Sequence, residues 1–262
     1  MIEIWNSFLI NPIFNILVWI YSFTGNLGIA IIVLTILIRS ALLPLVIPSF
    51  KAIKKQRALA PELEKLKQKY KDDKKVLAEK QMELFQKHGL NPLSGCLPQI
   101  LMIAILIALY GVITKFSNGI NIAELNSHIY FESLKFSADE IINTTFLYLD
   151  LVKPDPYFIL ATLSGAIQFL VSKMIMPYNE EGQKAASKTP DKADDIAYNI
   201  QNQMLYMTPI LTAVVSFSLP SGAVLYILTT TIFSLVQQYF ATGLGGLTPW
   251  VKKLGIIKNG KN

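Results

Sequence analysis

Long apolar segments alternate with polar ones along the whole chain. Five of them are long enough, or nearly so, to cross about 30 Å of hydrocarbon as helices. The fourth is short and is separated from the fifth only by Pro220, Ser221 and Gly222, which predicts a tight helical hairpin. The pattern predicts an all-α integral membrane protein with five transmembrane helices, at 25–50, 96–116, 157–177, 203–219 and 220–242.

The N-terminal segment, 1–24, has a different pattern. It contains no Lys or Arg, and aromatic residues are mixed with Asn and Ser. A basic start and a small-residue cleavage site, which a secretory signal needs, are not evident. The composition predicts an amphipathic helix lying in the membrane interface. An additional span is the alternative, although Asn11-Pro12 and Asn15 disfavour it.

The polarity changes abruptly after the first span, in the segment 51–95. Apolar residues recur there at helical spacing, and Asp72-Asp73 forms a predicted turn and N-cap. Gly89 is the predicted residue just past the end of a second helix. The segment is therefore predicted to be a cytoplasmic hairpin of two basic helices. The apolar faces of the two helices comprise Leu59, Leu63, Leu66 and Tyr70, and then Leu77, Leu84 and Phe85.

Two functions remain open for this hairpin. Its 12 basic residues against six acidic ones suit an electrostatic surface for anionic lipid headgroups or ribosomal RNA. Alternatively, its lysines only set the topology of a solvated helix pair. Interleaved acids and few aromatic residues for base stacking argue against dedicated nucleic-acid recognition.

Composition and charge refine this membrane prediction. Hydrophobic residues make up 52% of the chain, charged ones 16%, and the mean hydropathy is +0.41. Lys and Arg number 12 in 51–95, three in 178–202 and four in 243–262, against two in 117–156. The positive-inside rule then predicts a cytoplasmic hairpin, loop (178–202) and C-terminal tail (243–262). The N-terminus and the extracytoplasmic segment 117–156 face outward.

Arg39 is the one charged residue between Leu27 and Phe50. Snorkelling to a nearby interface is the alternative interpretation, which is disfavoured because Arg39 lies about 18 Å from the start of that run, at about 1.5 Å per residue. An arginine near the bilayer centre costs about 2.5–3.5 kcal/mol on insertion scales. The chain otherwise uses lysine as its cation, because 22 of its 24 basic residues are lysines and the only other arginine is Arg57. Arg39 is therefore the leading candidate for a functional residue.

The predicted spans contain polar partners for Arg39 but no Asp or Glu. A buried carboxylate would have made Arg39 half of a structural ion pair. Its absence predicts a hydrated, cationic cavity whose anion arrives from outside the chain. Individual hydroxyl residues are more often helix-packing residues, and the threonine run of the fifth span is the better candidate. The polar residues of the spans include Thr35, Gln168, Thr229, Thr230, Thr231 and Ser234.

The sequence contains no pattern typical of an enzyme or a metal site. Cys96 is the only cysteine, and His88 and His128 lack acidic residues at ligand spacing. We therefore expect no cofactor and no catalysis.

Several motifs resemble those of the YidC/Oxa/Alb membrane protein insertases, in the short form that lacks a large outer domain. They are GNLGIAIIVLTILIR at 25–39, the lysine-rich hairpin, NPLSGCLP at 91–98, IALY at 107–110 and LPSGAVLYILTTTIFSLVQQ at 219–238. The resemblance covers about residues 5–242. The chain departs from common family residues at Met102, Ala104 and Ile227.

The resemblance implies five helices around a hydrophilic groove open to the cytoplasm and to lipid, in a bacterial plasma membrane. Arg39 corresponds to the groove arginine, and Gln168 matches a groove-facing glutamine of some members. With Thr35, Thr230 and Ser234, these are the expected substrate-binding residues. The expected activity is insertion and chaperoning of nascent membrane proteins, with the ribosome, the Sec translocon and membrane lipids as partners. An anion transporter and an assembly scaffold without insertase activity are the alternatives.

Overall fold

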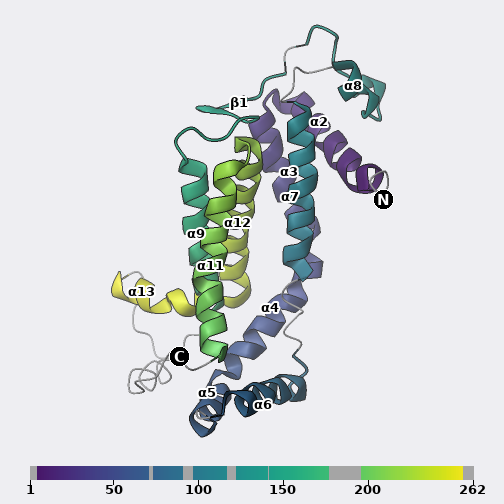
Figure 1. Cartoon of the computed structure of the whole chain (residues 1–262). Coiled ribbons are helices and arrows are strands. Elements are labelled where there is room, and N and C mark those ends of the chain that lie inside the picture. Colours follow the sequence, from purple (N-terminus) through teal and green to yellow (C-terminus); the bar gives the residue numbers. More distant parts are fainter. Residues whose placement is uncertain are drawn as a thin grey trace. The chain divides into compact units, whose positions relative to one another are not determined.

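The computed structural model describes residues 5–70, 73–90, 97–116, 122–140, 142–176 and 196–255, and most of these are helical (Figure 1). The description leaves out residues 91–96, which include Cys96 and most of the NPLSGCLP motif. It also leaves out residues 177–195, which contain most of the predicted loop, and residues 256–262 of the predicted tail. In chain order the elements are η1 (Asn6–Ile10), α2 (Asn11–Thr24), α3 (Leu27–Ala41), α4 (Leu43–Ala58), α5 (Ala60–Lys69), α6 (Lys74–Lys87), α7 (Leu97–Lys115), α8 (Ile122–Ser127), η3 (Glu132–Leu134), β1 (Thr145–Phe146), β2 (Leu149–Asp150), α9 (Ile159–Ile175), α11 (Ile196–Ser218), α12 (Ser221–Thr242), η5 (Gly245–Leu247) and α13 (Thr248–Lys253).

The chain divides into two compact units, which we describe separately. The first unit comprises Met1–Leu43, Pro98–Ala166 and Leu211–Phe233. The second comprises Pro44–Leu97, Ile167–Ile210 and Ser234–Asn262. The long helices α9, α11 and α12 each contribute residues to both units.

The first unit has a continuous apolar core in which α2 packs along α3. Where these helices lie in lipid, which is as apolar as their side chains, close van der Waals packing stabilises the cluster. Its fully buried large side chains come from four helices and from the segment after α8. They include Phe14, Leu17, Leu27, Ile31, Leu34, Leu109, Ile113, Leu125, Leu149 and Leu151.

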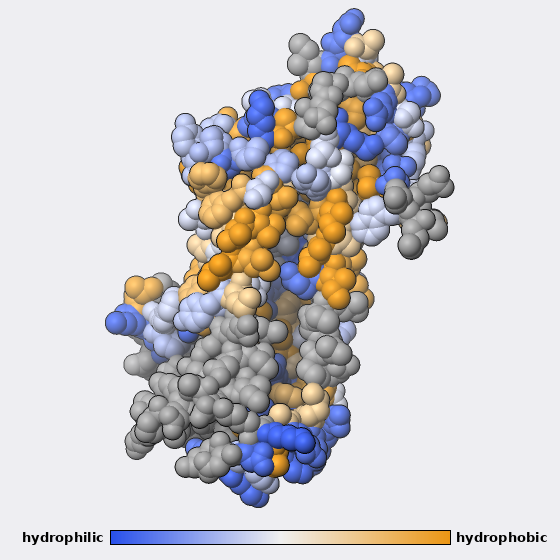
Figure 2. Space-filling model, viewed as in Figure 1, coloured by the Kyte–Doolittle hydropathy of each residue, from blue (hydrophilic) through white to orange (hydrophobic). Residues whose placement is uncertain are grey.

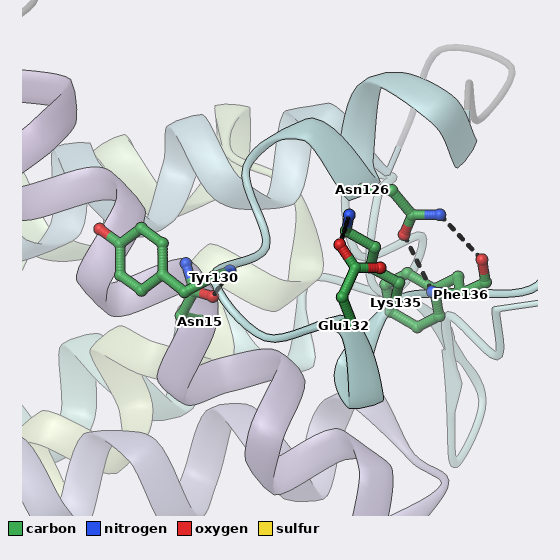
Figure 3. A network of polar contacts seen from close by, with 6 residues as sticks. All are labelled: Asn15, Asn126, Tyr130, Glu132, Lys135 and Phe136. Carbon is green, nitrogen blue, oxygen red and sulfur yellow. Dashed lines mark hydrogen bonds and ion pairs between the residues drawn. The ribbon is translucent and has the colours of Figure 1, made fainter.

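Asn15, which disfavoured a span in the sequence, is buried in α2 and binds the segment after α8 (Figure 3). Its Nδ2 donates to the His128 carbonyl at 2.9 Å, and its Oδ1 accepts from the Tyr130 backbone N–H at 2.7 Å. Asn126 bonds both backbone groups of Phe136, ten residues further along the chain. Its Nδ2 donates to the Phe136 carbonyl at 2.8 Å, and its Oδ1 accepts from the Phe136 N–H at 2.9 Å. Asn15 therefore holds the segment that follows α8 against α2. These hydrogen bonds explain why a polar residue is buried in α2.

The short hairpin β1–β2 lies at the N-terminal ends of two helices. Thr145 pairs with Asp150 and Phe146 with Leu149. The Asn26 side chain caps α3 and also donates to the Thr145 carbonyl at 3.0 Å. The backbone N–H groups of Ser221 and Gly222 donate to the carbonyls of Lys153 and Leu151, at 2.7 and 2.9 Å. The first N–H groups of a helix have no partner within that helix. The carbonyls of Leu151 and Lys153 are therefore the partners of the first N–H groups of α12.

The second unit contains the predicted basic hairpin, as helices α5 and α6. The N-cap prediction is confirmed at Asp73, whose carboxylate accepts from the N–H groups of Lys75 and Val76. Gly89 follows α6 with φ +64°, a conformation that favours glycine. Figure 2 shows a hydrophilic surface on these two helices, as their charge predicts.

The number of spans follows less directly from the structure. Among the described residues, Asn6–Thr24 and Ser221–Thr242 are long and apolar enough to cross a membrane. A third candidate span is the broken pair Leu27–Ala41 and Leu43–Ala58, and Gln99–Lys115, Ile159–Ile175 and Leu205–Ser218 are shorter apolar helices. The all-α membrane architecture agrees with the prediction, whereas the count of five and the interfacial placement of segment 1–24 stay predictions. Figure 2 shows hydrophobic side chains exposed along the apolar helices, as lipid contact would require.

The first predicted span is broken at Leu42, just past Arg39. Pro44 and Pro48 follow this break, and they favour it because proline removes a helix hydrogen bond and clashes with the preceding turn. Pro48 nevertheless lies inside α4, which continues to Ala58.

Candidate functional site

Arg39 lies in the last turn of α3 and is 7% exposed. The helix begins at the Asn26 cap, and its apolar residues pack in the core of the first unit. Thr35 lies one turn earlier on the same buried face. The fold therefore directs the guanidinium inward rather than toward an interface.

The Arg39 guanidinium lies against α12. Its Nη2 donates to the Thr230 carbonyl at 3.5 Å, and its central carbon lies 5.1 Å from the centroid of the Phe233 ring. The ring face carries partial negative charge, so it attracts a cation in this position. The buried charge is thus surrounded by dipoles and an aromatic ring.

The contacting face of α12 also includes Tyr226, which adds a hydroxyl to these surroundings. Tyr226, Thr230 and Phe233 are spaced at i, i+4 and i+7, which is one side of a helix. The Tyr226 hydroxyl donates to the Met102 carbonyl at 3.1 Å and lies 3.8 Å from the Met102 sulfur. Tyr226 and Phe233 were not among the predicted site residues, although their helical spacing around Thr230 is visible in the sequence.

The other predicted hydroxyl residues near Arg39 bond to their own helices. Thr35 Oγ1 donates to the Ile31 carbonyl at 2.6 Å. In the threonine run, Thr229 donates to Leu225 and Thr231 to Leu228, at 2.8 and 2.9 Å. Such back-bonding is the packing behaviour expected of most intramembrane hydroxyls. Thr230 is the member of the run whose backbone carbonyl receives Arg39.

Gln168 and Ser234 belong to the second unit and are both half-buried. Their place beside Arg39 in one groove stays a prediction. A water-filled cavity around Arg39 stays a prediction as well, because the side chain is covered in this structure.

This arrangement is suited to binding an anion, not to chemistry on a substrate. Neither α3 nor α12 contains an Asp or Glu. A carboxylate would form a charge-assisted contact with the guanidinium, stronger than the 3.5 Å contact with the Thr230 carbonyl. Across the described ranges, no group of three His, Cys, Asp or Glu residues is placed to hold a metal ion.

Arg57, the second arginine, has a structural setting in the second unit. It lies in the last turn of α4 and donates to the Thr242 carbonyl at 2.7 Å and to the Ile175 carbonyl at 3.4 Å. Nη2 also donates to the Met174 carbonyl. Carbonyls at helix C-termini have no partner within the helix, and a guanidinium fork suits them. Arg57 therefore joins the C-terminal ends of α9 and α12.

Comparison with known proteins agrees with the family resemblance. The sequence model of the 60Kd inner membrane protein family matches residues 19–244. The membrane protein insertase YidC of Fusobacterium nucleatum is 38% identical over 219 residues, which are 84% of this chain and 87% of that protein.

Two further relatives match nearly the whole chain. The membrane protein insertase YidC 2 of Bacillus anthracis is 33% identical, over 92% of this chain and 82% of its own length. The membrane protein insertase MisCA of Bacillus subtilis is 32% identical, over 91% and 79%. The chain therefore belongs to the 60Kd inner membrane protein family, the family of the YidC membrane protein insertases.

Proposed function

We propose that this protein inserts other proteins into a bacterial membrane, as the names of its relatives state for them. Such insertion forms and breaks no covalent bond, so the protein is not an enzyme. The single observation that carries the mechanism is the burial of the Arg39 guanidinium in the last turn of α3, beside the Thr230 carbonyl and the Phe233 ring.

In this mechanism Arg39 attracts an acidic residue in the outward-going tail of a nascent substrate. The substrate carboxylate replaces the 3.5 Å contact with the Thr230 carbonyl. This pairing offsets part of the cost of taking a charged tail out of water. The apolar span of the substrate then moves sideways into lipid. The carbonyl and the Phe233 ring remain as alternative partners, so the substrate can leave again.

The predicted topology assigns roles to the remaining parts. Gln168, Thr35, Thr230 and Ser234 line the proposed groove with Arg39. The basic hairpin α5–α6 receives the nascent chain on the cytoplasmic side, near the ribosome. Insertion proceeds with this protein alone or together with the Sec translocon, and the same surfaces act as a chaperone for folding spans.

The test measures insertion of a single-span substrate into proteoliposomes that contain Arg39→Ala, Arg39→Lys or the unmodified protein. An ion pair at about 4 Å and an effective dielectric of about 20 is worth about 4 kcal/mol. We therefore expect Arg39→Ala to lower insertion of an acidic-tailed substrate more than about tenfold. Arg39→Lys should keep most activity, since charge matters more than the guanidinium fork.

Two controls separate charge pairing from general damage. Lys115→Ala removes a basic residue at the end of α7 and should leave insertion unchanged. A substrate whose tail acids are changed to amides should depend little on Arg39. Equal loss for acidic and neutral tails would contradict the pairing while leaving the insertase activity intact.

A further inference from the structure

The C-terminal helix α13 forms a surface that the insertase mechanism does not use. It follows α12 after a turn in which Gly243 and Gly245 have φ +72° and +49°. The Gly246 N–H donates to the Met176 carbonyl at 3.1 Å, which ties the turn to the end of α9. Figure 1 shows α13 running roughly crosswise to the ends of α9 and α12. A helix in this position lies where a membrane-crossing α12 reaches the headgroups.

Trp250 is the centre of this surface. Its ring lies 6.1 Å from that of Phe169, at an interplanar angle of 35°, and yet the residue is 48% exposed. The Nζ of Lys173, from the last turn of α9, lies 5.6 Å from the Trp250 ring centroid. The contact fixes one lysine and one tryptophan from distant parts of the sequence beside each other. Tryptophan concentrates at membrane interfaces because its ring is apolar and its N–H is polar.

The described residues around Trp250 include several lysines. Lys252 and Lys253 form the last turn of α13, and Lys253 is exposed. Neither 156–176 nor 196–255 contains an Asp or Glu. An apolar side chain borders the same region, since Leu254, at the C-terminal end of α13, is 73% exposed. Cations beside exposed apolar groups match a phospholipid, whose headgroup is anionic and whose chains are apolar.

We propose that Lys173, Trp250 and Lys253 bind the headgroup of an anionic phospholipid at the membrane face where α12 ends. The positive-inside distribution predicts that face to be cytoplasmic. The lysines contact the phosphate, and the Trp250 ring lies at the boundary between headgroups and chains. This lipid site is independent of Arg39 and of insertase activity.

The experiment uses Trp250 itself as the probe in the full-length chain. The protein has three tryptophans, Trp5, Trp19 and Trp250, so Trp5→Phe with Trp19→Phe leaves Trp250 as the only one. This variant is reconstituted with brominated phosphatidylglycerol or brominated phosphatidylcholine, both of which quench nearby tryptophan fluorescence. We expect half-maximal quenching at a mole fraction of brominated phosphatidylglycerol about fivefold lower than that of brominated phosphatidylcholine. One lysine near an anionic membrane surface contributes about 1 kcal/mol, which corresponds to about this factor.

Charge variants complete the test. Lys173→Gln with Lys253→Gln should abolish the preference for the anionic lipid, and high salt should weaken it. Lys135→Gln with Lys153→Gln, which removes the two lysines of the 117–156 segment, should not change it. Circular dichroism checks that each variant stays folded.

Two results would overturn the proposal. Equal quenching by both lipids would make α13 a simple aromatic anchor without a headgroup site. Weak quenching by either lipid, with Trp250 fluorescence instead changed by added ribosomes, would assign the surface to a ribosome contact.

Discussion

The guanidinium of Arg39 faces the ring of Phe233, with 5.1 Å between its central carbon and the ring centroid. The two residues come from α3 and α12, which are separated by 191 residues at the Arg39–Thr230 contact. Arg39 is 7% exposed, so the ring is a substantial part of its surroundings. The contact with the Phe233 ring therefore helps to stabilise the buried guanidinium of Arg39.

The Phe233 ring should therefore contribute to stability through Arg39. Phe233→Leu keeps the apolar volume and removes the ring. A desolvated cation–π contact is worth about 0.5–2 kcal/mol. We expect a lower unfolding temperature in detergent, by about 2–4 °C for each kcal/mol lost.

The matched control is Phe240→Leu, on the same helix but 81% exposed. It should have little effect. In an Arg39→Ala background, Phe233→Leu should also lose most of its effect, because the cation is gone. Additive effects of the two substitutions would show that the ring only fills space.

Arg57 should hold the ends of α9 and α12 through its fork of donors. Arg57→Ala leaves the carbonyls of Thr242, Ile175 and Met174 without this partner. Leaving buried polar groups unpaired costs about 1–3 kcal/mol each, and these groups are only partly buried. We expect a loss toward the lower end of that range, with faster hydrogen exchange at Gly243–Leu247.

Arg57→Lys distinguishes the fork from the charge. A single ammonium cannot reach all three carbonyls in the same geometry, so the lysine variant should behave more like alanine than like arginine. Lys55→Ala, at an exposed position of the same helix, is the control and should be neutral. Full stability of Arg57→Lys would assign the effect to the helix dipoles.

Gly28 should tolerate no side chain. A Cβ there would lie 2.3 Å from Cγ and 2.6 Å from Cβ of Phe146, so the β1–β2 hairpin would have to move. Alanine normally favours a helix by about 1 kcal/mol over glycine. We expect Gly28→Ala to be destabilising despite that preference, as measured by thermal unfolding.

Gly111→Ala in α7 provides the comparison. Its Cβ would meet only Ile10 Cδ1, at 3.5 Å, which is an ordinary contact. This variant should be neutral or slightly stabilising. The cost of Gly28→Ala should shrink in a Phe146→Ala background, and an unchanged cost there would locate the strain elsewhere.

Asp150 should make stability depend on pH in the acidic range. Burial alone would raise the pKa of Asp150, but hydrogen bonds from Lys153, Val152 and Thr144 lower it below its usual 3.8. The folded state thus favours the ionised form. The resulting stability is present above the usual pKa and is lost as the pH falls through the lowered one.

Asp150→Asn should accordingly lower the unfolding temperature at neutral pH and converge with the unmodified protein in strong acid. Asp139→Asn, at an exposed site in the same outer segment, is the control. A difference that persists at the most acidic pH would mean that Asp150 acts through its shape and not through its charge.

The sequence alone was sufficient for the features that depend on local patterning. Apolar runs predicted the helices, and Asp73 and Gly89 predicted the ends of α6. The family could also be recognised from the sequence, because its motifs are short runs of neighbouring residues. Arg39 could be identified as a candidate functional residue because an arginine near the bilayer centre has an unfavourable free energy of insertion.

Tertiary structure decided which groups surround that charge. Tyr226 and Phe233 lie near Arg39 because α12 meets α3 in the fold, and the spacing of residues within α12 does not reveal which distant helix its face meets. The same holds for Arg57 with the ends of α9 and α12, and for Lys173 over Trp250. Local propensity and hydropathy act along the chain, whereas these contacts depend on how the helices pack in space.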